Sequence, residues 1–386
     1  MRAITYDGPN HLKVREKPYP RIEHPQDAIV EVLATGICGS DLHLLHGMIP
    51  DTRVGFTFGH ETVGVVVETG PECTGLQKGD RVLIPFQIFC GGCYHCQRGM
   101  TSSCENTNPA GDLAAGCYGY AHITGGYDGG QAEYRRVPFA DVDAEKVPED
   151  LSDLDAILLT DVMPTGYQAA EMCGIRGGET VVVFGCGPVG LHAMRAAWLM
   201  GAGRVIAVDH VPYRLEFARE WAGVETLNFR RVDVIEAIKS MTQGRGAHCS
   251  IDAVGVEAAG SATQRALGIY GKMFSGSSVA LNASIHATRK GGTVSVVGVY
   301  GPPFAPVDFG TAMNKQLTIR MGQTSVKRYI PHLVEHIRAG VFDSESIFTH
   351  RLSLEEGPKG YRIFAQKKDG CIKVALFPQG LPPTYH

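Results

Sequence analysis

The sequence predicts an α/β protein with two domains, one rich in β-strands and one formed around a doubly wound parallel sheet. Short strand-forming runs alternate with Gly/Pro turns up to about residue 150, and a strand-then-helix alternation follows from about residue 155 to 320. A glycine-rich turn lies near the start of the second pattern. A chain of 386 residues is long enough for each domain to bury its own core.

The β-rich part is predicted to form a folded-back antiparallel sheet or barrel, because its strand-forming runs are short and separated by turns. These runs are Ala28–Ala34, Thr62–Glu68, Arg81–Phe86 and Ala132–Val137. In the second part, strands and helices alternate as in a parallel sheet. They are strand Thr180–Phe184, helix Leu191–Met200, strand Val205–Asp209, helix Arg214–Ala222, and strands Ser250–Val254 and Thr293–Val299. A helix over Tyr329–Ala339 and a short β-rich run, Ile372–Leu376, end the chain.

The turn Gly185-Cys186-Gly187-Pro188-Val189-Gly190 predicts a dinucleotide site. A β-branched strand precedes it, an amphipathic helix follows it, and Asp209 ends the next strand. Such glycines permit a tight turn and the close approach of a pyrophosphate to a helix N-terminus. The Asp209 carboxylate can bond both hydroxyls of an adenosine ribose and would repel a 2′-phosphate, so NAD is favoured over NADP. A plain βαβ turn is the alternative.

Four cysteines, spaced Cys90-x2-Cys93-x2-Cys96-x7-Cys104, predict a structural zinc site. Tetrahedral zinc takes four thiolates at about 2.3 Å, and two-residue gaps let one loop place three of them around a single ion. The alternative, a disulfide framework, is typical of small secreted domains, whereas this long chain has 11 cysteines, an odd number. A closed four-cysteine site leaves no open position for a substrate.

A second pair of motifs, Gly36-Ile37-Cys38-Gly39-Ser40-Asp41-Leu42-His43 and Gly59-His60-Glu61, offers ligands for a catalytic metal. Taken singly, a cysteine or a histidine is most often an ordinary buried residue. Together, a thiolate and an imidazole are preferred ligands of catalytic zinc. Such a site needs three protein ligands and one open position, so a third ligand must come from elsewhere in the chain.

Composition excludes several classes of protein. Hydrophobic residues make up 44% and charged residues 20%, which argues against disorder and coiled coil. The net charge of −4 and the absence of a Lys/Arg run argue against nucleic acid or an anionic membrane as partner. We see no signal peptide and no apolar run long enough to span a bilayer, so the cytoplasm is the expected location.

In their order along the chain, these motifs resemble those of the zinc-containing medium-chain alcohol dehydrogenases. The match consists of Cys38 to His43, Gly59-His60-Glu61-x2-Gly64-x5-Gly70, the four cysteines and the glycine-rich turn, and it covers essentially the whole chain. It implies a GroES-like catalytic domain, residues 1–160 and 321–386, and a Rossmann NAD-binding domain, residues 161–320. The segment Thr160-Asp161-Val162-Met163-Pro164-Thr165-Gly166 is similar to the glutathione-independent formaldehyde dehydrogenase branch.

The resemblance implies a role for each matching residue. Cys38, His60 and Asp161 would hold a catalytic zinc, which with the four-cysteine site makes two zinc ions per chain. Glu61 would enter this site transiently or shape its field. Asp41 would accept the second N–H of His60.

The remaining roles concern the proton and the cofactor. Ser40 would hydrogen-bond the substrate oxygen at the zinc and pass its proton through the nicotinamide ribose to His43 at the surface. The resemblance assigns four further cofactor contacts: Thr165 against the nicotinamide, Val297 at its carboxamide, Arg214 near the adenosine ribose, and Lys373 facing the pyrophosphate.

The interval between Gly255 and Thr288 is longer than the single helix that is usual there, and four glycines interrupt it. The formaldehyde branch carries an extra loop near this place that covers the NAD adenine. By resemblance, Ile269–Leu281 would do the same and would retain NAD through turnover. An ordinary surface insertion is an equal alternative.

Three functions follow. The favoured one is zinc-dependent hydride transfer between an alcohol, or a hydrated aldehyde, and dissociable NAD. The second is a formaldehyde or small-aldehyde dehydrogenase or dismutase that holds NAD tightly. The third is a non-catalytic dinucleotide-binding module, against which the intact zinc ligands argue. Because cofactor domains of this family usually pair through an exposed strand edge, a homo-oligomer, dimer or tetramer, is also expected.

Overall fold

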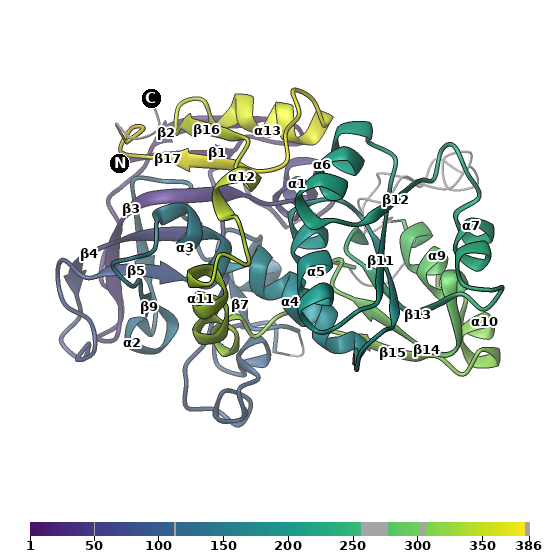
Figure 1. Ribbon diagram of the computed structural model, residues 1–386. Helices are drawn as coiled ribbons and strands as arrows, with labels where there is room; N and C mark the ends of the chain where they lie inside the picture. Colours follow the sequence, from purple (N-terminus) through teal and green to yellow (C-terminus); the bar gives the residue numbers. More distant parts are fainter. Residues whose placement is uncertain (50, 112, 256–276, 301–305, 383–386) are drawn as a thin grey trace. The chain divides into compact units, whose positions relative to one another are not determined.

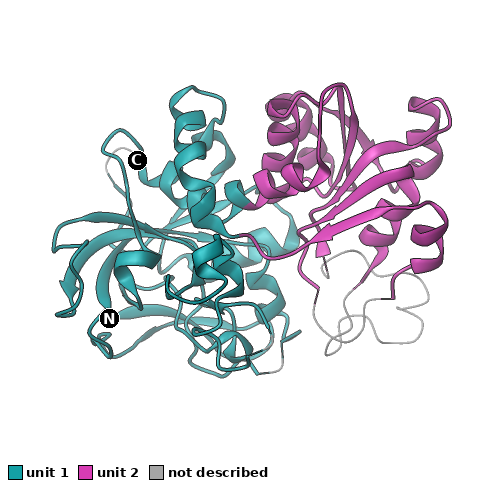
Figure 2. Ribbon diagram, turned by 90° about the horizontal axis from the view of Figure 1, so that it is seen from below, with its two compact units in different colours: residues 1–164, 325–386 teal, residues 165–324 magenta. Residues whose placement is uncertain are grey.

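The computed structural model describes residues 1–49, 51–111, 113–255, 277–300 and 306–382 (Figure 1). It divides into unit 1, Met1–Pro164 with Ser325–His386, and unit 2, Thr165–Thr324 (Figure 2). Both boundaries lie later than the predicted ones, after residues 160 and 320, so Asp161 belongs to unit 1. The reason is that α3 (Asp153–Thr160) packs against the sheet of unit 1 and keeps the residue that follows it there.

Unit 1 is formed around a mainly antiparallel sheet with strand order β16-β17-β3-β4-β5-β9, in which β8 also pairs with β3. The β16–β17 pair is parallel and the other pairs are antiparallel. The strands are β3 (Ala28–Ile37), β4 (Thr62–Thr69), β5 (Arg81–Ile84), β8 (Tyr134–Val137), β9 (Glu145–Lys146), β16 (His350–Ser353) and β17 (Val374–Phe377). Two short pairs accompany them: β1 (Arg2–Tyr6) with β2 (Leu12–Glu16), and β6 (Gln87–Ile88) with β7 (Gly116–Cys117).

Alternating side chains of these strands bury an apolar cluster, here called the sheet core. It consists of Ala28, Val30, Val66, Leu76, Val82, Ile84, Ile88, Tyr118, Val137, Ala140 and Ala144. The helices of unit 1 are α1 (Asp41–Leu45), α2 (Ala140–Asp143), α3, α11 (Ile330–Arg338), α12 (Ser344–Ile347) and α13 (Gly357–Gln366). Helix α3 begins at a capping box in which Ser152 and Asp155 bond each other's backbone N–H, which fixes its start.

Unit 2 contains a parallel sheet with strand order β12-β11-β10-β13-β14-β15, which confirms the predicted doubly wound architecture. The strands are β10 (Thr180–Phe184), β11 (Arg204–Asp209), β12 (Glu225–Asn228), β13 (Ala247–Asp252), β14 (Thr288–Val296) and β15 (Thr318–Met321). Helices α5 (Pro188–Leu199) and α6 (Pro212–Ala222) pack on β10–β12, and α9 (Val279–Ala287) packs on β13 and β14. Helices α7 (Val234–Met241) and α10 (Phe309–Asn314) contact α9. Helix α4 (Val162–Cys173) crosses from unit 1 into unit 2.

The predicted adenine-covering loop, Ile269–Leu281, lies mostly outside the described residues, which resume at Ser277. Its last residues do not form a loop. Val279 begins α9, and Leu281 is buried in a cluster with Ile285, Val294, Val296 and Ala312. This end of the segment is therefore part of a helix that packs on the sheet, because its apolar side chains cover β14.

Unit 2 also contains a disulfide between Cys173, the last residue of α4, and Cys249 in β13. Both side chains are buried. Neither cysteine belongs to the predicted zinc motif, and no spacing rule pairs them.

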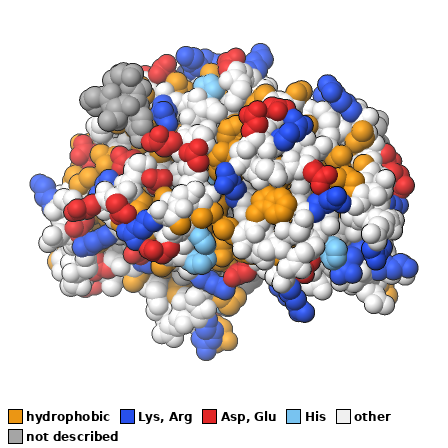
Figure 3. Space-filling model, in the orientation of Figure 1, with side chains coloured by type: hydrophobic (Ala, Val, Ile, Leu, Met, Phe, Trp, Pro, Cys, Tyr) orange, Lys and Arg blue, Asp and Glu red, His pale blue; other side chains and the backbone are white. Residues whose placement is uncertain are grey.

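Within the part of the chain that the structure describes, no helix has both the length and the apolar character needed to cross a membrane. Figure 3 shows acidic and basic side chains interspersed over the visible face.

Candidate metal centres and cofactor site

Cys38, His60 and Asp161 converge in unit 1 from the ends of three elements. Cys38 follows β3, His60 precedes the neighbouring strand β4, and Asp161 follows α3. Oδ2 of Asp161 lies 3.4 Å from Sγ of Cys38 and 3.2 Å from Nε2 of His60. Together with Glu61, their potential ligand atoms all lie within 4.8 Å of one another, and all four residues are buried. The structure therefore brings the three predicted zinc ligands together.

Asp41 contacts the ring nitrogen of His60 that points away from this cluster. Nδ1 of His60 lies 3.2 Å from Oδ1 of Asp41. The other oxygen of Asp41 accepts hydrogen bonds from the Cys38 backbone N–H at 3.0 Å, Nε2 of Gln131 at 3.3 Å and the Tyr361 hydroxyl at 3.1 Å. These donors hold the carboxylate in place, and it in turn orients the imidazole so that Nε2 faces the other ligands.

The electrostatics of this cluster suit a cation. Burial alone would lower the pKa of His60, but the charges of Asp41 and Cys38 raise it. Burial opposes ionisation of Asp161, yet its hydrogen bond and charge interaction with His60 lower its pKa. Burial and the Asp161 charge raise the pKa of the Cys38 thiol. A divalent ion would let the thiol and the carboxylate ionise together, and sulfur, nitrogen and oxygen donors fit zinc.

Glu61 lies in this cluster and forms a fully buried ion pair with Lys373. Nζ of Lys373 donates to Oε1 of Glu61 at 2.7 Å and to the Ile37 carbonyl at 3.2 Å. A Cβ on Gly36 would lie 1.8 Å from Oε2 of Glu61, so only glycine leaves room for this carboxylate. Lys373 was predicted to face the cofactor pyrophosphate; its ammonium group pairs with Glu61 here, and the pyrophosphate contact stays a prediction. Pairing of β17 with β3 carries the lysine into the interior, where Glu61 neutralises it.

The structure also corrects the predicted position of His43. This residue lies in α1 and is 3% exposed, so it does not lie at the surface of unit 1. Its Nδ1 is 3.0 Å from the hydroxyl of Tyr120, whose pKa is raised by burial. Ser40 lies before the same helix, and its Oγ is 3.3 Å from Nε2 of His60. The Tyr120 hydroxyl is therefore the next group to which His43 can pass a proton.

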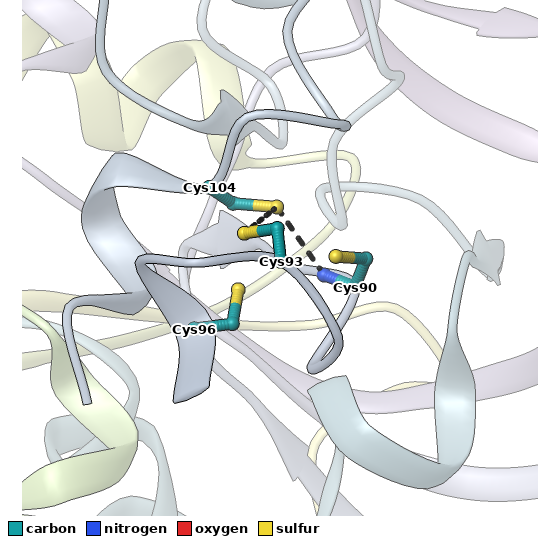
Figure 4. A group of neighbouring side chains, drawn as sticks. All are labelled: Cys90, Cys93, Cys96 and Cys104. Atoms are coloured by element: carbon teal, nitrogen blue, oxygen red, sulfur yellow. Dashed lines mark hydrogen bonds between the residues drawn. The ribbon is translucent and has the colours of Figure 1, made fainter. Parts of the chain in front are cut away.

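The second metal cluster is the four-cysteine lobe (Figure 4). Its sulfur atoms belong to Cys90, Cys93, Cys96 and Cys104, and they lie within 4.8 Å of one another. The Cys90 backbone N–H donates to Sγ of Cys104 at 3.4 Å, and the Asn106 amide donates to Sγ of Cys90 at 3.3 Å. Burial would raise the pKa of Cys93, but backbone N–H groups, first that of Glu105, lower it to about 6. Four converging sulfurs with N–H donors fit tetrahedral zinc.

In unit 2, the glycine-rich turn connects β10 to α5. Gly185 has a φ of 99°, which glycine adopts at little cost. A Cβ on Gly190 would lie 1.9 Å from the Gly185 carbonyl oxygen. Gly187 is the N-cap of α5 and Pro188 its first residue. The turn thus has the close backbone approach and the helix N-terminus that a pyrophosphate site requires.

Asp209 ends β11 beside this turn. Its Oδ2 accepts a hydrogen bond from the Cys186 backbone N–H at 2.9 Å, and its Oδ1 accepts from the N–H groups of His210 at 2.6 Å and Val211 at 3.0 Å. Burial would raise the pKa of Asp209, but the His210 side chain first, then the backbone N–H groups of Cys186 and Val211 and the charge of Arg214, lower it strongly. The carboxylate is therefore ionised at neutral pH.

The three other predicted cofactor residues of unit 2 have distinct positions. Arg214 is buried in α6, and its Nη1 lies 4.0 Å from where a Cβ on Gly187 would be. Thr165 lies within α4. Val297 follows β14, and its N–H donates to the Asp252 carbonyl at 3.1 Å, so this N–H is not available to a carboxamide.

Sequence analysis did not identify Gln131, Tyr361 or Tyr120. The first two hold Asp41 from positions 90 and 320 residues away. Gln131 is a polar residue directly before a predicted strand, which is a weak signal, and Tyr361 and Tyr120 lie in no motif.

The family model described as the alcohol dehydrogenase GroES-like domain matches residues 24–149, and the one described as zinc-binding dehydrogenase matches residues 188–276. The uncharacterized zinc-type alcohol dehydrogenase-like protein AdhB of Bacillus subtilis is 44% identical over 382 residues, which cover 98% of this chain and 100% of AdhB.

Two further proteins are similar over nearly their full length. The glutathione-independent formaldehyde dehydrogenase of Pseudomonas aeruginosa is 34% identical over 389 residues, covering 94% of each chain. Among solved structures, alcohol dehydrogenase TADH from Thermus sp. ATN1 matches with a TM-score of 0.82 and 36% identity, covering 98% of this chain and 99% of that one.

Proposed function

The chain belongs to the zinc-type medium-chain alcohol dehydrogenase family, and from this premise we propose that it transfers hydride between an alcohol, or a hydrated aldehyde, and NAD. The observation that carries the proposal is the buried convergence of Cys38, His60 and Asp161, with the Ser40 hydroxyl beside them. A thiol, an imidazole and a carboxylate whose ligand atoms lie within 4.8 Å of one another match the three protein ligands that a catalytic zinc with an open position needs.

Sγ of Cys38, Nε2 of His60 and Oδ2 of Asp161 would hold this zinc. When bound, the ion acts as a Lewis acid that favours the ionised form of an alcohol and polarises an aldehyde carbonyl. Asp41 keeps His60 in the tautomer whose Nε2 is free to bind metal. Glu61 and Lys373 form a buried ion pair beside the three ligands. Because their charges cancel, the pair adds no net charge to the site.

The proton of the alcohol would leave through hydroxyl and imidazole groups of unit 1. Ser40 would accept it from the substrate oxygen and pass it towards His43, through the nicotinamide ribose. The 3.0 Å contact between His43 and Tyr120 supports a continuation of this path through the tyrosine hydroxyl. Reduction of an aldehyde would use the same groups in the opposite direction.

NAD would bind to unit 2, with its pyrophosphate at the turn Gly185 to Gly190. An aspartate carboxylate has about four acceptor positions, and in Asp209 three of them accept hydrogen bonds from backbone N–H groups. The remaining capacity suits a ribose hydroxyl, and the charge disfavours the 2′-phosphate of NADP. Thr165 and Arg214 remain proposed contacts of the nicotinamide and adenosine ends, and Val297 would contact the carboxamide through groups other than its N–H.

A second candidate function is conversion of formaldehyde or another small aldehyde with retained NAD. Its support is the similarity to a protein named glutathione-independent formaldehyde dehydrogenase. The amount of NAD(H) that remains with the purified protein distinguishes the two candidates.

We also propose a homo-oligomer that forms through the edge of the unit 2 sheet. Strand β15 is the last in the strand order, and no strand lies on its outer side among the described residues. Phe309, Met313 and Met321 near this edge are 70%, 79% and 65% exposed. An unpaired edge beside exposed apolar side chains suits pairing with a second copy of the chain. The cytoplasm stays the expected location.

The proposed function is tested by zinc content and turnover together. We expect two zinc ions per chain in the wild type and one in Asp161→Ala, with NAD-linked alcohol oxidation reduced by at least about a thousandfold, because the Lewis acid is lost. The control, Asp161→Cys, supplies another zinc ligand and should keep both ions. An Asp161→Ala protein that retains two zinc ions and full turnover would contradict the proposal.

A further inference from the structure

Unit 1 contains two completely buried glutamine side chains that differ in how their amides are bonded. Nε2 of Gln131 donates to the Gly36 carbonyl at 3.0 Å, and its Oε1 accepts from the Tyr361 hydroxyl at 2.8 Å. Gln87 is also 0% exposed, yet neither its Oε1 nor its Nε2 has a hydrogen-bond partner among the described residues. Most buried polar groups in native proteins are paired, so both amide atoms of Gln87 retain the capacity to bond a water molecule or a ligand.

The strand pairing shows which way this amide faces. Gln87 lies opposite Cys117 in the antiparallel β6–β7 pair, so the two side chains project to the same face. Their neighbours, Ile88 and Tyr118, belong to the sheet core. Because successive side chains of a strand alternate between faces, Gln87 and Cys117 point away from the sheet core.

The proposed catalytic metal cluster lies next to these two strands. The backbone N–H of Phe86, the residue before β6, donates to the carbonyl of Thr160 at 3.2 Å, and the next residue after Thr160 is Asp161, the proposed third zinc ligand. The Phe86 ring is 6.1 Å from the ring of His60. On the adjacent strand, burial raises the pKa of the Cys117 thiol, and the nearby charges of His60 and Asp161 also affect this pKa. These contacts place β6 and β7 beside the ligand cluster, and Gln87 projects from β6 on the same face as Cys117.

We propose that Gln87 is a specificity-determining residue that hydrogen-bonds a second hydroxyl of the substrate, on the reacting carbon or on the carbon next to it. This inference rests on the proposed function. An amide offers one acceptor and donors close together, and a hydroxyl can satisfy both kinds of group. An alkanol with a single hydroxyl would leave the buried amide unpaired, and a site of this kind discriminates against such a substrate. The preferred substrates are thus vicinal diols or hydrated aldehydes.

The test compares substrates that differ by one hydroxyl in the wild type and in Gln87→Met, which keeps the length of the side chain and removes the amide. Propane-1,2-diol against propan-1-ol reports on a vicinal hydroxyl, and hydrated formaldehyde against methanol reports on a geminal one. We expect the wild type to prefer the dihydroxylated member of at least one pair, in kcat/KM, and Gln87→Met to reduce that preference by about tenfold to a hundredfold.

Thermal unfolding supplies a readout that does not depend on activity. Replacing an unpaired buried amide with an apolar side chain should leave the melting temperature unchanged or higher. The matched control, Gln131→Met, removes a bonded amide and should lower it. Substrate preferences equal to those of the wild type, or a Gln87→Met protein destabilised as much as Gln131→Met, would overturn the inference. A zinc-loaded wild type that oxidises none of the four compounds with NAD would instead contradict the proposed function, and the inference with it.

Discussion

Two buried carboxylates show how single residues in this chain are prepared for binding. Asp41 accepts hydrogen bonds from the Cys38 backbone and from two distant side chains, and it contacts His60. Asp209 accepts three backbone N–H groups around the glycine-rich turn. In both cases the donors replace hydrogen bonds to water that burial removes. A carboxylate held in place in this way can orient an imidazole in one site and, at Asp209, whose pKa is lowered, select a cofactor in the other.

The charge of Asp209 predicts a change in cofactor preference. In the double variant Asp209→Gly/His210→Arg, the ratio of kcat/KM for NADP to that for NAD should rise by about a hundredfold or more, because repulsion becomes attraction at the 2′-phosphate. Steady-state kinetics with both cofactors measure this ratio. The glycine also removes the acceptor of three backbone hydrogen bonds, so Asp209→Gly alone serves as the control for stability. A wild type that uses NADP as well as NAD would refute the assignment of Asp209.

At the scale of elements, the four-cysteine lobe has few other means of staying folded. Its ligands lie in a loop whose regular elements are 3₁₀ turns of three residues, Cys96–Arg98 and Thr101–Ser103. The small cluster around Phe89 and Ala115 consists largely of the ligands themselves. A bound zinc would therefore contribute much of the stability of this segment.

Cys93→Ser should lower both the zinc content, from two ions per chain to one, and the melting temperature. The reason is that three thiolates and a serine hydroxyl bind zinc far more weakly than four thiolates. Elemental analysis and thermal unfolding measure the two effects. Cys73→Ser, which changes a cysteine outside both clusters, is the control and should retain two ions. Unchanged zinc content in Cys93→Ser would show that the lobe is not a metal site.

Helix α2 carries a carboxyl group that makes stability depend on pH. Burial raises the pKa of Asp143 to about 8, although the Tyr118 hydroxyl at 2.6 Å and the charge of Arg135 act against the shift. The pKa of an aspartate in an unfolded chain is about 3.9. Between about pH 4 and pH 8 the folded state therefore holds a proton on Asp143 that the unfolded state has released. The contribution of this group to the free energy of unfolding is therefore highest below about pH 4 and falls as the pH rises towards 8, by up to about 1.4 kcal/mol per unit.

Asp143→Asn should remove this dependence, because its amide can accept the tyrosine hydrogen bond and cannot ionise. Urea unfolding of both proteins at about pH 5 and about pH 8 gives the difference between their slopes. Equal slopes would mean that Asp143 is already ionised across this range in the folded protein.

At the scale of the whole molecule, the candidate metal sites and the candidate cofactor site lie in different units. Unit 1 contains both metal clusters, and unit 2 contains the glycine-rich turn with Asp209. The exposed edge strand β15 and the apolar side chains near it belong to unit 2.

The oligomer should dissociate when charge is placed on this edge. We expect Phe309→Glu/Met321→Lys to elute with the mass of one chain, 41.6 kDa, because burial of these charges between two copies is costly. Light scattering coupled to size exclusion measures the mass. Val54→Lys changes an exposed apolar residue of unit 1 and should leave the mass of the wild type. If the double variant keeps that mass as well, another surface forms the oligomer.

Much of the fold and of the ligand set could be predicted because the signals are local. The β10–turn–α5 segment follows from a β-branched run and its glycines, and β10 has the predicted bounds. The four cysteines lie within one loop, so their spacing alone brings them together. Family resemblance added Asp161, which no local pattern identifies as a ligand. The prediction that His43 lies at the surface failed because burial is a property of packing, which the residues next to it in sequence do not determine.

The sequence by itself determined the order of strands and helices, the two zinc motifs and the dinucleotide turn, since each depends on neighbours a few residues apart. Only the tertiary structure decided how buried polar groups are paired. Tyr361 reaches Asp41 across 320 residues, β17 carries Lys373 to Glu61, and Gln87 is left without a partner among the described residues. These outcomes depend on pairing between segments that are remote in sequence. Because burying an unpaired charge or amide costs free energy, the partners available in the fold then determine what each residue can bind.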